Sequence, residues 1–177
     1  GEKEVWKGRW DEANDDFERG YEASNGRRHT LWQTVWWMSG PYSDDIDEVL
    51  PLETNPDPRR VPDADDPATW WAAELIDPER IPIGGLGSAS YYLVKHIWTP
   101  RAREVAIQLE IAAPARLIVN HETVSISPTS DSQTTFTHLK VGWNTVLLKV
   151  RNVTGEESVA RCAIIGNKKA IEQLRIQ

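Results

Sequence analysis

The sequence predicts an all-β protein, an antiparallel β-sandwich of jelly-roll type. Three observations predict it. Short segments with strong β-propensity recur at regular intervals after residue 89, and turn residues separate them. No helical pattern lies between these segments, which argues against a parallel α/β sheet. Prolines concentrate in residues 51–88, where they exclude long helices and central strands.

We expect the chain to divide into a lead-in segment (residues 1–30), a β-sandwich domain (31–166) and a C-terminal tail or linker (167–177). In the lead-in, four aromatic residues recur at a spacing that fits one face of a helix, so a helical or irregular segment is expected: Trp6, Trp10, Phe17 and Tyr21. The pattern in residues 168–175 predicts a short C-terminal helix.

The first expected strand covers residues 31–38 and ends at Gly40-Pro41. Residues 51–88 then form a long excursion or several short edge pieces. Within it, Trp70 and Trp71 lie either in a short helical turn or in a short strand. The β-rich half predicts strands at residues 91–98, 104–111, 116–120, 123–127, 134–139, 144–152 and 158–165.

The most informative stretch is LKVGWNTVLLKV, residues 139–150, which predicts a strand end, a tight turn and a second strand. Gly142 supplies the backbone freedom that the turn needs. Val146, Leu148 and Val150 alternate onto one face of the second strand. Trp143 at the turn has little local apolar surface to pack against, so either another loop covers it or it presents a flat face to a ligand.

The overall composition limits the kinds of partner. With 20 basic and 27 acidic residues the formal net charge is −7, which argues against a nucleic acid. No apolar run approaches the roughly 20 residues of a membrane span. Cys162 is the single cysteine, so an internal disulfide is excluded and an inert core thiol is expected. Nine tryptophans against two phenylalanines favour stacking or interface contacts.

Four pieces of residues 36–165 resemble the jelly-roll sugar-binding domains attached to β-galactosidase-like glycoside hydrolases, and related carbohydrate-binding modules. These are WMSGPY with the later LPLE (residues 37–42 and 50–53), YLVKHIWTP (92–100), ARLIVNHE (115–122) and LKVGWNT (139–145). The resemblance implies the same β-sandwich fold and a role in binding glycans. The chain departs from the pattern at His121, where the hairpin glycine is expected, and at Trp143, where the last turn is usually polar.

We expect the ligand-binding residues among the tryptophans and the polar loop tips. Trp143 is the first candidate platform for a pyranose ring. Trp36 and Trp37 are adjacent in a strand and point to opposite faces, so one belongs to the core and the other is free to line a groove. The remaining candidates are the pair Trp70 and Trp71 and the polar residues Asn120, His121 and Arg103.

No catalytic residue is predicted, because no pair of carboxylates or nucleophile motif has a recognisable context. The histidines lack metal-ligand spacing, so no metal or cofactor is required. A structural Ca²⁺ is the alternative for the acidic turn with Asp44, Asp45 and Asp47, where a solvated acidic loop is otherwise expected.

These observations predict a non-catalytic carbohydrate-binding module of a larger polysaccharide-degrading enzyme. The expected partners are a polysaccharide or oligosaccharide and the catalytic domain of the parent chain, and the expected state is a monomer. The expected location is secreted or cell-surface, in the extracellular or periplasmic space of a bacterium. The alternative is a structural ancillary β-sandwich domain without a ligand.

Overall fold

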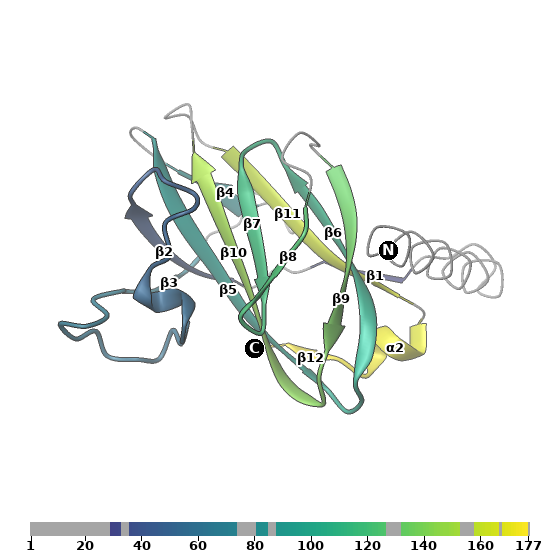
Figure 1. The fold of residues 1–177 in the computed structure, drawn as a ribbon. Coiled ribbons are helices and arrows are strands. Elements are labelled where there is room, and N and C mark those ends of the chain that lie inside the picture. Colours follow the sequence, from purple (N-terminus) through teal and green to yellow (C-terminus); the bar gives the residue numbers. More distant parts are fainter. Residues whose placement is uncertain are drawn as a thin grey trace, which may run out of the picture.

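The computed structural model confirms the predicted antiparallel β-sandwich, which consists of two sheets packed face to face (Figure 1). It describes residues 29–32, 36–73, 81–84, 88–126, 132–152, 158–166 and 168–176. Most of the predicted lead-in, residues 1–28, lies outside the described residues. No helix in the described ranges is long and apolar enough to span a bilayer.

The five-stranded sheet has the order β1-β11-β6-β9, and β4 also pairs with β11. Its strands are β1 (His29–Trp32), β4 (Ile81–Ile83), β6 (Arg103–Ile111), β9 (Ser132–Leu139) and β11 (Ser158–Gly166). The seven-stranded sheet has the order β3-β2-β5-β10-β7-β8, and β12 also pairs with β5. Its strands are β2 (Trp37–Tyr42), β3 (Trp71–Ala72), β5 (Ala89–Thr99), β7 (Ala115–Val119), β8 (Glu122–Val124), β10 (Gly142–Asn152) and β12 (Arg175–Ile176).

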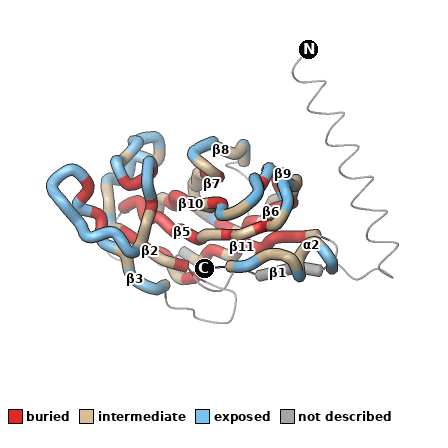
Figure 2. Tube along the Cα trace, turned by 90° about the horizontal axis from the view of Figure 1, so that it is seen from below, coloured by how far each residue is buried: buried red, intermediate tan, exposed pale blue. Residues whose placement is uncertain are grey.

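The main core lies between the two sheets, where Figure 2 shows most of the buried positions. As predicted, Val146, Leu148 and Val150 point into it from β10. Ile107 and Leu109 meet them from β6 on the opposite sheet. Burying each such side chain contributes roughly 1.5–3 kcal/mol, so period-two alternation specifies which face of each strand is internal.

The prediction of one strand over residues 31–38 is wrong. The chain passes from the five-stranded to the seven-stranded sheet within this run, so β1 ends at Trp32 and β2 begins at Trp37. Gly40 and Pro41 do not end the strand but lie inside β2, where the pairing with β5 shifts register between Ser39 and Tyr42. Proline fits there because β3 pairs only with the first residues of β2, so Pro41 lies on an open edge.

A second, smaller core lies on the outer face of the seven-stranded sheet. The first part of the proline-rich excursion folds over this face, beginning with the short helical turn η1 (Pro51–Glu53). Its Leu52 and Ala68 pack on Val94 and Leu147 of the sheet. The excursion therefore covers one part of the outer face and protrudes beside β2 and β3 (Figure 1).

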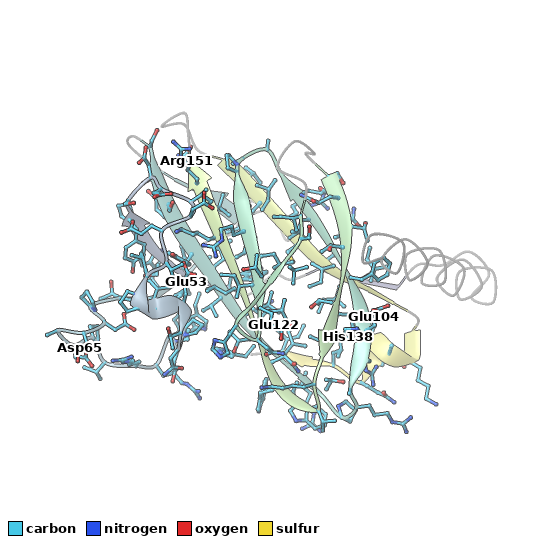
Figure 3. The ribbon with its side chains drawn as sticks, in the orientation of Figure 1. Glu53, Asp65, Glu104, Glu122, His138 and Arg151 are labelled. Carbon is cyan, nitrogen blue, oxygen red and sulfur yellow. The ribbon has the colours of Figure 1, made fainter. Side chains whose placement is uncertain are left out.

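A buried polar cluster anchors this excursion. Figure 3 shows Glu53 between η1 and the sheet, where its Oε1 accepts a hydrogen bond from the Tyr92 hydroxyl at 2.6 Å. The Lys149 ammonium and the Arg116 guanidinium each lie 3.8 Å from the same oxygen. Both cations also donate to backbone carbonyls of the acidic turn, Lys149 to Asp45 and Arg116 to Ile46. Carboxylate and carbonyl oxygens thus compensate two cations that the fold removes from water.

We predict that Glu53→Gln lowers the free energy of unfolding by about 2 kcal/mol, because the buried Lys149 and the partly buried Arg116 lose their counter-charge. The amide still accepts from Tyr92, so Tyr92→Phe is the matched control and costs about 1 kcal/mol. Denaturant unfolding measures the free-energy change of both variants. Limited proteolysis tests whether the excursion is cut faster in the Glu53→Gln variant than in the unmodified protein. Equal losses in the two variants would contradict a role for the charge.

The C-terminal helix is shorter than predicted. Helix α2 covers Lys168–Glu172 only, and Arg175 lies in β12, where it pairs with Trp98 of β5. The Arg103 guanidinium fastens this segment, since it donates to the Ala170 carbonyl at 3.2 Å and to Gln173 Oε1 at 2.7 Å. The β5 edge leaves a place for β12 because β2 pairs with β5 only between Ser90 and Val94.

Two ionisable groups lie inside the main core. Cys162 is buried as predicted, and burial raises the pKa of its thiol to about 12. Lys95 points inward from β5 with its Nζ 5.2 Å from the ring centroid of Trp36. Burial lowers the pKa of Lys95 from 10.5 to about 8.

We predict that Lys95 makes the protein more stable at high pH. Below about pH 8 the lysine is charged in both states, and the cost of burying the charge is fully present. Between about pH 8 and 10.5 the unfolded chain keeps the proton that the folded chain has lost, so stability rises. Relative to Lys95→Met, the free energy of unfolding should increase by roughly 2 kcal/mol from pH 7 to pH 10. Parallel pH profiles for the two proteins would contradict this.

Candidate functional site

The candidate site is the part of the outer face of the seven-stranded sheet that the excursion leaves uncovered. Three residues form a row across β12, β5 and β10 here, because Arg175 and Trp143 both lie opposite Trp98 in register. Residues directly opposite each other in antiparallel strands share one face of the sheet. We call Arg175, Trp98 and Trp143 the aromatic row. Trp143 is 48% exposed, the largest exposure among the described tryptophans.

The turn before β10 positions Trp143. Gly142 has φ +93°, a conformation that favours glycine, and space is open around its Cα. Trp143 follows as the second residue of β10 and points away from the main core, because Asn144 on the other side of the strand is buried. The predicted tight turn carrying an exposed tryptophan is therefore present.

Asn144 holds this turn through its side-chain amide. Its Oδ1 accepts from the Lys140 amide at 2.8 Å, and its Nδ2 donates to the carbonyls of Lys140 at 2.9 Å and Gly142 at 3.0 Å. The same Nδ2 lies 3.3 Å from the Ile97 carbonyl in β5. One buried side chain thus fixes the turn to the strand that carries Trp98.

Asn120 links a second turn to the first. Asn120 and His121 both have positive φ, 49° and 71°, so the β7–β8 hairpin closes with a type I′ turn. The Asn120 amide donates to Asn144 Oδ1 at 2.7 Å and accepts from the Thr145 amide at 3.0 Å. Asn120 was predicted to contact a ligand, but both ends of its side chain are engaged within the protein. His121 lies exposed at the tip of this turn.

The other side of Trp98 contacts Arg175. The guanidinium carbon of Arg175 lies 4.8 Å from the ring centroid of Trp98, within cation–π range. Trp98 is partly exposed, so it is neither buried in the core nor fully open to solvent. The row therefore presents an aromatic surface with a cation at one end.

A polar row lies next to the aromatic row, toward the excursion. His96 of β5 and Thr145 of β10 lie opposite each other, and both are partly exposed. Burial lowers the pKa of His96, the carboxylate of Asp57 opposes that change, and the cation of Arg59 adds to it. The excursion residues Asp57 and Arg59 therefore influence His96 electrostatically.

The other predicted ligand residues do not join the aromatic row. One member of the pair Trp36 and Trp37 was predicted to belong to the core, and it is Trp36, which is 1% exposed in the main core. Trp37 and Trp70 are half-buried in the second core beneath the excursion. Trp71 is 41% exposed, but it lies in the edge strand β3, opposite Met38. The guanidinium of Arg103 is occupied by the C-terminal segment.

The acidic turn is held by cations of the chain. Asp44 Oδ2 lies 3.4 Å from the Arg151 guanidinium, which Figure 3 labels at the far end of the sheet. A side-chain oxygen of Asp45 accepts from the Asp47 amide at 2.9 Å. In the ranges that the structure describes, no three His, Cys, Asp or Glu side chains gather as metal ligands.

Two members of the row escaped prediction as ligand residues. Trp98 was expected in a core or rim position, because its strand alone gave no register with Trp143. Arg175 was expected on a helix, and only the end of α2 and the pairing of β12 bring it to Trp98. The sequence alone shows only that Trp98 and Trp143 each lie next to a turn, and the pairing of β5 with β10 brings the two residues together.

Comparisons with known proteins concern the fold. No family model matches the chain, and no curated protein matches it. Solved structures with similarity include a family 35 carbohydrate-binding module from an environmental isolate (18% identity, 58% of this chain, 80% of that chain, TM-score 0.39). The CBM35 from Cellvibrio japonicus Abf62 is 13% identical (83% of this chain, 96% of that chain, TM-score 0.40). The β-glucosidase from Kluyveromyces marxianus in complex with glucose is 11% identical (77% of this chain, 17% of that chain, TM-score 0.47).

Proposed function

We propose that the chain is a non-catalytic carbohydrate-binding module whose ligand site is the aromatic row. The single observation that carries the proposal is the pairing of Trp98 and Trp143 on an uncovered sheet face. Two neighbouring indole side chains offer an apolar surface. Polar residues border it, with His96 and Thr145 on one side, whereas a core would have apolar neighbours. Such a combination suits a sugar, which has an apolar ring face and polar edges.

In this mechanism a pyranose ring stacks on the indole of Trp143, and its hydroxyl groups hydrogen-bond to the neighbouring polar side chains. Stacking contributes about 1 kcal/mol beyond the area it buries. The rigid attachment of the turn by Asn144 lowers the entropic cost of binding, because Trp143 is held in place before the ligand arrives. No chemical step is required of the protein.

The larger context belongs to the same proposal. The module would be part of a secreted or cell-surface polysaccharide-degrading enzyme. Binding a polymer through the aromatic row would raise the local concentration of substrate around the catalytic domain of the parent chain. The proposed module acts as a monomer, since one face of one sheet carries the whole aromatic row.

Affinity gel electrophoresis against a panel of soluble plant and algal polysaccharides tests the proposal. The protein should be retarded by at least one polymer, and its tryptophan emission should shift to shorter wavelength on binding, because the exposed Trp143 loses water. Bovine serum albumin on the same gels controls for simple sieving. No retardation and no emission change across the panel would refute carbohydrate binding.

One observation favours a second candidate, a structural ancillary domain. Val141 is 63% exposed in the turn that precedes Trp143, so this turn also presents an aliphatic side chain that a sugar does not need. An apolar patch of this kind also fits against a neighbouring domain. If the panel gives no binding, a chain extended to include its neighbouring domain should show Trp143 protected from N-bromosuccinimide.

A further inference from the structure

We propose that the aromatic row selects glycans that carry anionic groups, and that Arg175 is the specificity-determining residue. The inference rests on the proposed function and names the class of sugar that the same site would bind. Carboxylate and sulfate groups share the required chemistry, a planar or tetrahedral anion attached to the edge of a ring, and the experiment below distinguishes them.

Arg175 lies at one end of the aromatic row, beside Trp98. Its guanidinium lies 4.8 Å from the Trp98 ring centroid, and the residue is exposed. A guanidinium on an aromatic ring keeps its N–H groups directed outward in its own plane, where they can donate two parallel hydrogen bonds to one anion. Among the described residues, no carboxylate forms an ion pair with Arg175.

The C-terminal segment holds Arg175 in this position. Arg103 donates to Ala170 and Gln173, which precede β12, and the strand then pairs with β5 at Trp98 and Ile97. A long cationic side chain that is ordered before binding loses less rotamer entropy when it meets an anion. The cation is therefore a built part of the row.

Further positive charge lies at this end of the sandwich. The β5–β6 and β9–β10 turns lie side by side, because Thr99 pairs with Gly142 and Arg103 pairs with Leu139 (Figure 1). These turns carry the exposed cations Arg101 and Lys140, which also lack an ion pair with any carboxylate that the structure describes.

The cations at this end of the sandwich contrast with the charge of the chain as a whole. The whole chain has a formal net charge of −7, so an excess of cations at one end runs against the composition. Acidic residues of the excursion are paired locally, for example Asp57 with Arg59 at 3.2 Å and Asp63 with Arg60 at 2.7 Å. A polyanion that meets this end of the sandwich would therefore find cations that lack a described ion-pair partner, on a chain whose total charge is negative.

Matched polymers test the inference. Polygalacturonic acid is compared with its methyl ester, and a sulfated galactan with its desulfated form, by affinity electrophoresis and calorimetry. We expect the charged member of at least one pair to bind about tenfold more tightly, an advantage comparable to one charge-assisted contact. Raising the salt from about 20 mM to about 200 mM should reduce that advantage. Preference within the first pair identifies carboxylate, and preference within the second identifies sulfate.

The variant Arg175→Gln should remove most of this preference, because it weakens binding of the charged polymers much more than binding of the neutral ones, while Arg175→Lys should retain part of it. Arg161→Gln, on the five-stranded sheet, is the matched control and should bind as the unmodified protein does. Equal binding of charged and neutral polymers, or an equal loss for both in Arg175→Gln, would overturn the inference and leave the proposed function intact. Failure of the unmodified protein to bind any polymer would refute the proposed function itself.

Discussion

Replacing Trp143 by alanine is expected to lower the affinity for the bound glycan about tenfold, the equivalent of about 1.4 kcal/mol. Trp143 is the most exposed tryptophan of the described residues, and its ring forms one end of the aromatic row. The alanine variant loses the flat apolar face but keeps the turn, because Gly142 and Asn144 hold the backbone. Isothermal titration calorimetry measures the change in affinity.

Trp71→Ala is the matched control for this result. Trp71 has a similar exposure, 41%, but it lies in the edge strand β3, away from the aromatic row. Its removal should leave the affinity within about twofold. The double variant Trp98→Ala/Trp143→Ala should abolish measurable binding. Equal losses in Trp71→Ala and Trp143→Ala would show that general surface hydrophobicity, and not this row, carries the interaction.

The second large effect is expected from Asn144→Ala, which should lower the free energy of unfolding by about 3 kcal/mol. The substitution leaves the Lys140 amide and the Lys140 and Gly142 carbonyls without their side-chain partner, and the Asn120 amide loses its acceptor. For a chain of this size the melting temperature should fall by about 10 °C. Differential scanning calorimetry measures it.

Two further variants separate stability from binding. Asn144→Asp keeps the acceptor for Lys140 and Asn120 but buries a carboxylate whose second oxygen faces three carbonyls, so it should cost at least as much as alanine. Folded Asn144→Ala, measured well below its melting temperature, should bind glycan more weakly, because Trp143 is no longer fixed. An Asn144→Ala variant with unchanged stability would contradict the assignment of Asn144 as the fastener of this turn.

Local sequence patterns account for most of the fold. The strands from residue 89 onward are predicted within a few residues, because strict alternation of apolar side chains lets only one face of each strand be buried. The turn before β10 is also evident, since Gly142 adopts a positive φ that other residues rarely accept. The errors fall at residues 31–38 and 168–175, where apolar patterns were too short to show a change of sheet or the end of a helix.

The candidate site was predicted in part. Trp143 is recognisable because a tryptophan beside a turn glycine has no local core. Trp36 and Trp37 are adjacent, so the sequence places them on opposite faces of the sheet, but it could not tell which face the excursion covers. Asn120 was predicted as a ligand-binding amide, and only its hydrogen bond to Asn144 at 2.7 Å shows that the two residues fasten two turns.

By itself, the sequence determined an antiparallel β-sandwich, the inward face of its main strands and a tryptophan at a turn, either covered by another loop or open to a ligand. These are consequences of residue type and spacing along a single strand. Only the tertiary structure decided that Trp98 and Arg175 stand beside Trp143, because the register of β5, β10 and β12 joins residues far apart in the chain. It also decided which end of the outer face stays open, since that depends on where the proline-rich excursion finds apolar partners.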